Sequence, residues 1–258
     1  MSLPGTARPG GEPRVLFVHV MKTAGTTFMW HLRTQFAPEE IAPCRGIDWT
    51  EPTDVGVYVD LERLAAMPAD RLARVRVIAG HYPYAARALI PGPLRTTTIL
   101  REPVARTVSL LKHFKRLHPP SRDRSLAEIY ADPDRFVGFI ENHQTRVFSI
   151  EPADNVRSVR DPVVIDERRF DIALANLGAV DVLGISERYD DFVEALRARF
   201  GWWSGGAPAA LRANSATEEW DADDELRERI AADNPWDMAL YAAAVRIVAA
   251  QRSDRLRG

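Results

Sequence analysis

Short apolar runs separated by helical patterns recur along the chain. Apolar or β-branched runs begin near residues 15, 75, 95 and 180, and the stretches between them repeat apolar residues at helical spacing. Short strands that alternate with helices are typical of a parallel sheet with helical crossovers. The pattern therefore predicts an α/β fold, with a mainly parallel sheet covered by helices on both faces and ligands at the carboxyl ends of the strands.

The second half of the chain is less regular. Charged helical patterns near 125–148 and 166–177 lie outside the strand order, so we expect residues 117–178 to form a helical insertion or lid. A last helix is predicted to begin at Asn234-Pro235, an N-cap followed by a first-turn proline. Residues 1–258 are expected to form a single domain, with the Pro/Gly-rich residues 1–13 flexible.

A polar turn follows the first apolar run. Residues 15–20 are predicted to form a strand, and Phe28, Leu32 and Phe36 indicate a helix, so residues 21–25 must form a tight loop between them. The first amides of a helix and the positive end of its dipole favour an anion, and a lysine and hydroxyl groups add donors. A turn that only caps the helix is the alternative. The predicted phosphate cradle consists of Lys22, Thr23, Ala24, Gly25, Thr26 and Thr27.

The order of residues in this cradle distinguishes it from the common nucleotide triphosphate loop. That loop has its lysine after the second glycine, whereas here Lys22 precedes Gly25. The segment 22–27 instead resembles the 5'-phosphosulfate loop of sulfotransferases that use 3'-phosphoadenosine 5'-phosphosulfate (PAPS). The likeness is to the Golgi-type carbohydrate sulfotransferases, and Ala24 fits the heparan sulfate 2-O-sulfotransferase branch. This resemblance implies a P-loop-like three-layer α/β/α fold with a helical insertion.

A second motif follows a later strand. The strand ending at Leu100 runs into Arg101, so the guanidinium lies at its carboxyl end, and Ser109 follows nearly two turns into the next helix. A planar guanidinium pairs well with phosphate oxygens. The segment 101–109 resembles the Arg-(Asp/Glu)-Pro-x-x-Arg-x-x-Ser site of sulfotransferases, which implies that Arg101 and Ser109 bind the 3'-phosphate. A surface ion pair between Arg101 and Glu102 is the alternative.

The third predicted strand ends in the pair Gly80-His81. An imidazole is half ionised close to neutral pH, which suits proton abstraction from an acceptor hydroxyl. The heparan sulfate 2-O branch has its base in such a Gly-His pair, which implies that His81 is the catalytic base. The alternative is a histidine bonded to a backbone carbonyl. His19, inside the first strand, is interpreted as a buried structural residue. No role is assigned to His31, His113, His118 and His143.

The resemblance continues more faintly toward the end of the chain. Residues 180–188 resemble the late strand of the family, and residues 211–215 occupy the place of its loop over the adenine and 3'-phosphate. That position implies cofactor contacts, and a solvent loop is the equal alternative. The residues concerned are Arg212, Asn214 and Ser215. The segment 237–241 is similar to the Asp-x-x-Leu-Tyr signature of many members and is interpreted as structural.

Composition narrows the setting. A net charge of −2 and a pI near 6.3 argue against a nucleic-acid or anionic-membrane partner. Cys44 is the only cysteine, so no internal disulfide can form, which fits a reducing compartment. No run approaches membrane-span length, and we expect a soluble cytoplasmic enzyme of bacterial style. The animal Golgi enzymes carry a membrane anchor, so a glycosaminoglycan acceptor does not follow from the resemblance.

The motifs together predict an enzyme that moves the sulfuryl group of PAPS to a hydroxyl of a carbohydrate or small metabolite. The product would be PAP, Lys22 would stabilise the departing phosphate, and no metal is required. A nucleotide kinase or NTPase and a non-catalytic nucleotide-binding protein remain the alternatives. Several arginines of the insertion could contact an anionic acceptor, although we favour a solvated charged face. They are Arg122, Arg124, Arg146, Arg157 and Arg160.

Overall fold

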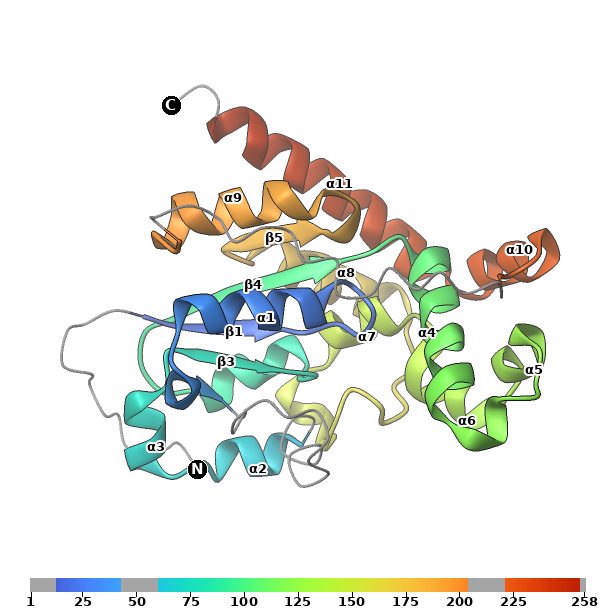
Figure 1. The fold of residues 1–258 in the computed structure, drawn as a ribbon, viewed down its shortest axis with the longest axis horizontal. Coiled ribbons are helices and arrows are strands. Elements are labelled where there is room, and N and C mark those ends of the chain that lie inside the picture. The colour runs from blue at the N-terminus through green and yellow to red at the C-terminus, as the bar shows by residue number, and fades with distance from the viewer. Residues whose placement is uncertain (1–12, 43–59, 204–220, 256–258) are drawn as a thin grey trace.

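A five-stranded sheet forms the centre of the molecule (Figure 1). The computed structural model describes residues 13–42, 60–203 and 221–255, and the strand order is β2-β3-β1-β4-β5 with every pairing parallel. The predicted α/β fold with a mainly parallel sheet is therefore confirmed. The strands are β1 (Arg14–Val18), β2 (Ile41–Ala42), β3 (Val77–Gly80), β4 (Leu94–Leu100) and β5 (Val182–Ile185).

The four strands predicted from apolar runs are all present, with different limits. β1 ends at Val18, so His19 follows the strand rather than lying inside it. β2 has two residues, too few to produce a pattern in the sequence. The threonines of β4 are buried because their hydroxyl groups bond to neighbouring strands: Thr97 Oγ1 donates to Val182 O at 2.9 Å and Thr98 Oγ1 to Val18 O at 2.8 Å. Polar side chains can therefore occupy the middle of this sheet.

One face of the sheet is covered by α1 (Gly25–Gln35) and α9 (Tyr189–Phe200). Phe17 of β1 packs edge-on against Phe28 of α1 at 4.5 Å between ring centroids, and Phe28 packs against Phe192 of α9 at 5.2 Å. All three rings are buried. This aromatic contact fixes the direction in which α1 leaves the loop after β1.

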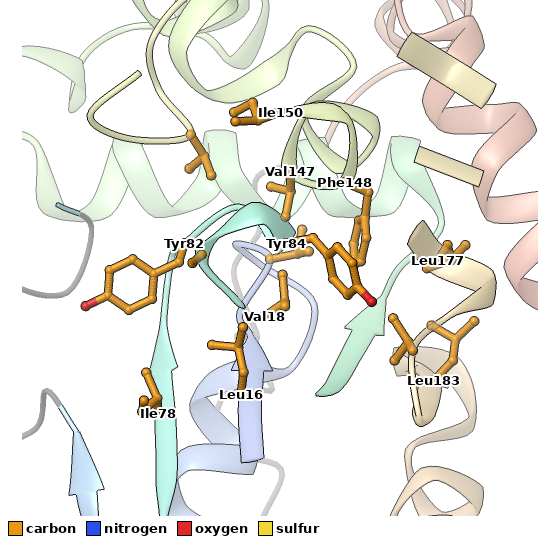
Figure 2. Packing of buried hydrophobic residues seen from close by; sticks show 14 of the residues in the cluster. Leu16, Val18, Ile78, Tyr82, Tyr84, Val147, Phe148, Ile150, Leu177 and Leu183 are labelled. Atoms are coloured by element: carbon orange, nitrogen blue, oxygen red, sulfur yellow. The ribbon is translucent and has the colours of Figure 1, made fainter. Parts of the chain in front are cut away.

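The opposite face is covered by α7 (His143–Ser149), α8 (Glu167–Gly178) and α11 (Pro235–Arg255). Figure 2 shows Val18 of β1 beneath Tyr84 and α7, and the Tyr84 ring lies 5.8 Å from Phe148. Leu177 of α8 belongs to the same core. α7 and α8 both lie within residues 117–178, so part of the segment expected to form an insertion packs in this layer of the fold.

A third group of helices lies beyond the carboxyl ends of the strands (Figure 1). It consists of α4 (Pro103–Leu117), α5 (Leu126–Tyr130), α6 (Pro133–Arg135), the π-helical turn η5 (Phe136–Ile140) and α10 (Asp224–Asp233). Leu111, Ile129 and Ile230 share its separate apolar core. The described chain also contains α2 (Leu61–Ala65), α3 (Ala69–Arg74) and the 3-10 turns η1 (Pro38–Glu40), η3 (Tyr84–Leu89), η4 (Pro119–Ser121), η6 (Pro152–Asp154) and η7 (Ser186–Arg188). Among the described helices, none has the length and apolar character needed to span a bilayer.

Candidate active site

Three neighbouring strands end at the predicted site. β3 leads to His81, β1 leads to the loop at Lys22, and β4 leads to Arg101. β1 pairs with both β3 and β4 in parallel, so the three carboxyl ends lie side by side at one edge of the sheet. Residues that are up to 79 positions apart in sequence are thereby brought to one place, which is where open α/β sheets bind ligands.

The loop after β1 has an unusual backbone. Lys22 and Ala24 both adopt left-handed conformations, with φ of 67° and 70°. Thr23 between them is fully buried, and its Oγ1 donates to Val20 O at 2.9 Å. α1 then begins at Gly25. Left-handed residues in alternation turn successive backbone amides toward one side and create a concavity that suits an anion. Thr26 and Thr27 lie half-buried in the first turn of α1.

Gly25 is required by the ring of His19. A Cβ atom added at Gly25 would lie 1.8 Å from His19 Nε2, so no other residue fits without moving the ring. The His19 ring stacks on Phe17 at 5.2 Å and lies 4.3 Å from the ring of His81. Burial lowers the pKa of His19 well below its ordinary value, and the charges of His81 and Lys22 lower it further. His19 is therefore a buried neutral residue whose ring packs beneath the loop at Gly25.

His81 is held in one tautomer. Its Nδ1 lies 2.6 Å from the backbone oxygen of His19. A carbonyl oxygen can only accept, so Nδ1 carries the proton and Nε2 carries the lone pair. Burial lowers the pKa of His81 to about 4, and the positive charges of Arg160, Arg106 and Lys22 act in the same direction. The hydrogen bond to His19 raises the pKa and offsets part of this effect. The ring is thus neutral at pH 7, and the prediction of an imidazole that is half ionised close to neutral pH is wrong.

Arg101 connects the two motifs that the sequence predicts to bind phosphate. Its Nη1 donates to the backbone oxygen of Lys22 at 3.2 Å. Glu102 does not pair with it in the way the sequence alternative supposed, because the Glu102 carboxylate accepts the amides of Val104 and Ala105 at 3.0 and 2.6 Å and caps α4. The half-exposed guanidinium of Arg101 therefore lies between the loop and the start of α4.

One face of α4 is turned toward the loop. Ser109 is half-buried on this helix, and His113 follows one turn later on the same side. Burial lowers the pKa of His113 to about 4, and the positive charges of Lys22 and Arg116 act in the same direction. The Lys22 ammonium therefore lies within electrostatic reach of α4 as well as of His81.

Three residues that hold the backbone around the candidate site were given no role in it from the sequence: Arg106, Gln144 and Asp237. Arg106 is fully buried behind the loop, where its Nε donates to Met21 O at 3.2 Å. The side chain of Gln144 bonds to the backbone of Arg101. The second arginine of the 101–109 motif was the only available signal for Arg106. The role of Gln144 depends on a contact between residues 43 positions apart, which leaves no local pattern.

Asp237 anchors α7 to α11. Its buried carboxylate accepts the amides of Gln144 and Thr145 at 3.0 and 2.7 Å and the Thr145 hydroxyl at 2.8 Å. The side chain of Asn142 accepts the Asp237 amide at 3.2 Å, and Asn234 Oδ1 accepts the Asn142 amide at 2.8 Å. The structural interpretation of the 237–241 signature fits these contacts.

Some of the remaining predicted residues lie outside the described part of the chain, and others lie in α7 or in the segment after it. Arg212, Asn214 and Ser215 lie outside the described residues. Arg146, for which the sequence favoured a solvated charged face over contact with an acceptor, is fully buried and donates to Val137 O and Glu141 O. Arg160 is exposed and stacks over the Phe139 ring at 5.7 Å. In the described ranges, no group of three or more His, Cys, Asp or Glu side chains is arranged to hold a metal ion.

The fold is similar to that of a bacterial enzyme of known structure. The crystal structure of a sulfotransferase from Alicyclobacillus acidocaldarius matches 91% of this chain and 96% of its own, with a TM-score of 0.52 and 17% sequence identity. At this identity the likeness establishes the fold, which is a mostly parallel α/β sheet as the sequence predicted. No family model matches the chain, and no curated protein matches it.

Proposed function

We propose that this protein is a PAPS-dependent sulfotransferase that transfers the sulfuryl group to an alcohol oxygen and releases PAP. The observation that carries the proposal is the hydrogen bond from Arg101 Nη1 to Lys22 O. It joins the loop that resembles a 5'-phosphosulfate cradle to the motif that resembles a 3'-phosphate site. A ligand with phosphates at both ends of its ribose would span these two motifs.

The donor side of the proposed site consists of charge and directed amides. The concave loop at residues 22–25 and the start of α1 would bind the 5'-phosphate, and Lys22 would stabilise the negative charge that grows on it during transfer. Arg101 would bind the 3'-phosphate with the Ser109 hydroxyl. The guanidinium has five N–H donors, so one bond to Lys22 O leaves donors for phosphate oxygens.

The acceptor side contains the proposed base. Nε2 of His81 would take the proton of the acceptor hydroxyl while the acceptor oxygen forms its bond to sulfur. The bond between sulfur and the bridging oxygen breaks in the same step, and its electron pair remains on the 5'-phosphate of PAP. The transferred proton ends on His81, and solvent removes it after PAP leaves. The imidazole must be neutral for this role, and its low pKa keeps it so at pH 7.

The acceptor that fits this proposal is a hydroxyl of a carbohydrate or small metabolite. Support comes from the Gly80-His81 pair, which resembles the heparan sulfate 2-O branch of the Golgi-type enzymes. The exposed Arg160 guanidinium contributes positive charge near His81. This charge disfavours a cationic acceptor such as an amine.

The test is a thermal shift of the purified protein with PAP, AMP and ATP, each with and without magnesium. A ligand that binds the native state raises its melting temperature. We expect a metal-independent shift that is larger for PAP than for AMP. Equal shifts for PAP and AMP would overturn the 3'-phosphate assignment. A shift only with ATP and magnesium would support the kinase alternative instead.

A further inference from the structure

Three successive backbone oxygens of the loop are held by side chains. Val20 O accepts from Thr23 Oγ1 at 2.9 Å, Met21 O accepts from Arg106 Nε at 3.2 Å, and Lys22 O accepts from Arg101 Nη1 at 3.2 Å. Each oxygen is thereby directed toward the protein. Since the carbonyls along this stretch are occupied, the adjoining amides are left to face the ligand side of the loop.

This arrangement explains how the loop tolerates its backbone strain. Lys22 and Ala24 adopt left-handed conformations although neither is glycine. Such conformations are unfavourable for ordinary residues and persist only where neighbouring contacts enforce them. Two of the three enforcing contacts come from α4 and the turn before it. Thr23 supplies the only one of the three that is local to the loop.

Arg106 is one of these donors and links the loop to a second segment. Its side chain is fully buried, and Nη2 donates to Phe139 O of η5 at 2.6 Å while Nε holds Met21 O. Nη1 has no hydrogen-bond partner among the described residues. Burial lowers the pKa of Arg106 to about 10, so the guanidinium remains charged at pH 7. A full positive charge therefore lies behind the loop, on the side opposite the proposed ligand.

We infer that Arg106 is a positioning residue for the 5'-phosphate: by holding Met21 O, it fixes the left-handed turn at Lys22 and directs the loop amides at the anion. The inference rests on the proposed function, because it assigns the 5'-phosphate of PAP to this loop. Arg106 itself does not touch the ligand. Its planar fork spans two carbonyls on separate segments, Met21 of the loop and Phe139 of η5, which a lysine ammonium cannot match in geometry.

The inference predicts that Arg106 affects binding of the 5'-phosphate of PAP and leaves binding of the 3'-phosphate unchanged, and the two effects can be measured separately. Isothermal titration with PAP and with adenosine 3'-phosphate gives the factor by which the 5'-phosphate improves affinity. In Arg106→Lys we expect this factor to fall about tenfold or more, the equivalent of about 1.4 kcal/mol. The affinity for adenosine 3'-phosphate should stay within about twofold, because Arg101 and Ser109 are unchanged.

Arg146→Lys is the matched control. Arg146 is also a fully buried arginine with two carbonyl partners, Val137 O and Glu141 O, neither of which belongs to the loop. Both variants should lower the melting temperature, and only Arg106→Lys should change the ratio between the two ligands. If Arg106→Lys is too unstable to titrate, Arg106→Gln replaces it, because removing the buried charge also removes its desolvation cost.

The outcomes distinguish the inference from the proposed function. Wild-type protein that gains nothing from the 5'-phosphate would overturn both. Wild-type protein that binds PAP more tightly than adenosine 3'-phosphate, with the same factor in the Arg106 variant, would overturn the inference alone. A factor that collapses in the Arg106 variant and survives in Arg146→Lys would establish the positioning role, because a merely structural loss would weaken both ligands equally.

Discussion

The side chain of Gln144 holds the backbone of Arg101 from both directions. Gln144 Oε1 accepts the Arg101 amide at 3.1 Å, and Gln144 Nε2 donates to the Arg101 oxygen at 2.8 Å. Gln144 is itself fixed, since its own amide donates to Asp237 of α11 at 3.0 Å. Arg101 in turn donates to Lys22 O. Contacts therefore run without interruption from the last helix, through α7, to the loop proposed to bind phosphate.

Gln144→Glu should weaken PAP binding without touching the ligand. The substitution keeps the shape of the side chain but replaces the donor that faces the Arg101 oxygen with a carboxylate oxygen. One lost hydrogen bond of this kind costs about 1 kcal/mol, so we expect PAP affinity to fall about fivefold. Titration calorimetry measures the PAP affinity of the variant and the wild type, and Gln35→Glu at the end of α1 is the control. Unchanged affinity in Gln144→Glu would mean that Arg101 needs no support from α7.

Sequence patterns predicted the parts of this site that are local. The loop at Lys22 and the motif at Arg101 each combine an apolar strand with a distinctive turn, and both lie at the sheet edge where the pattern placed them. β2 was missed because a two-residue strand has no periodicity. Gln144 and Asp237 were missed as support for the site because their contacts join residues 43 and 93 positions apart.

The sequence also misjudged two environments, for a shared physical reason. Arg146 looked like one of several surface cations, yet its guanidinium is buried against backbone oxygens. His81 was expected to be half ionised, yet burial lowers its pKa to about 4. Residue type indicates charge in water, whereas burial by elements distant in sequence sets the charge and partners of a side chain in the fold.

Gly25→Ala should disrupt the loop. The new methyl group would lie 1.8 Å from His19 Nε2, so either the buried ring or α1 must move. We expect a loss of about 1–3 kcal/mol in the free energy of unfolding, measured by urea denaturation, together with weaker PAP binding. Gly178→Ala is the control, because a Cβ at that position meets no atom within 4 Å. It should be neutral or slightly stabilising.

A double substitution tests whether the ring of His19 is the cause. His19→Ala removes the ring that the Gly25→Ala methyl group would strike. The two changes together should therefore cost less than the sum of the single changes, a non-additivity of about 1 kcal/mol or more. Strict additivity would show that the ring of His19 is not what excludes a methyl group at Gly25.

His81→Gln should separate catalysis from donor binding. If His81 takes the acceptor proton, its loss should lower kcat by about 10²–10⁴-fold while PAP affinity changes little. The reaction should also have an acid limb, because protonation removes the lone pair on Nε2. With the pKa near 4, kcat/KM should stay level as pH falls from 7 to 5 and decline below that, provided the protein remains folded. A limb centred near pH 6.5 would contradict the buried environment described for this ring.

His143 should make the fold sensitive to acid. It is fully buried at the start of α7, and neither ring nitrogen has a hydrogen-bond partner among the described residues. Burial lowers its pKa well below the ordinary value, and the charges of Arg106, Arg146 and His81 add to the effect. In the unfolded chain this imidazole binds a proton below about pH 6.5, whereas in the folded protein it stays neutral. The folded state is therefore destabilised relative to the unfolded state as the pH falls below about 6.5.

His143→Met removes this proton linkage. Between pH 7.5 and 5.5 a single histidine of this kind lowers the free energy of unfolding by about 1.4 kcal/mol, and the variant should lose less stability than the wild type by that amount. At pH 7.5 the free energy of unfolding of the variant should lie at most about 1 kcal/mol below that of the wild type, because no hydrogen bond is lost and methionine adapts its shape to the space. Denaturation at the two pH values measures both quantities. Equal pH dependence in the two proteins would mean that His143 is protonated, or bonded to water, inside the fold.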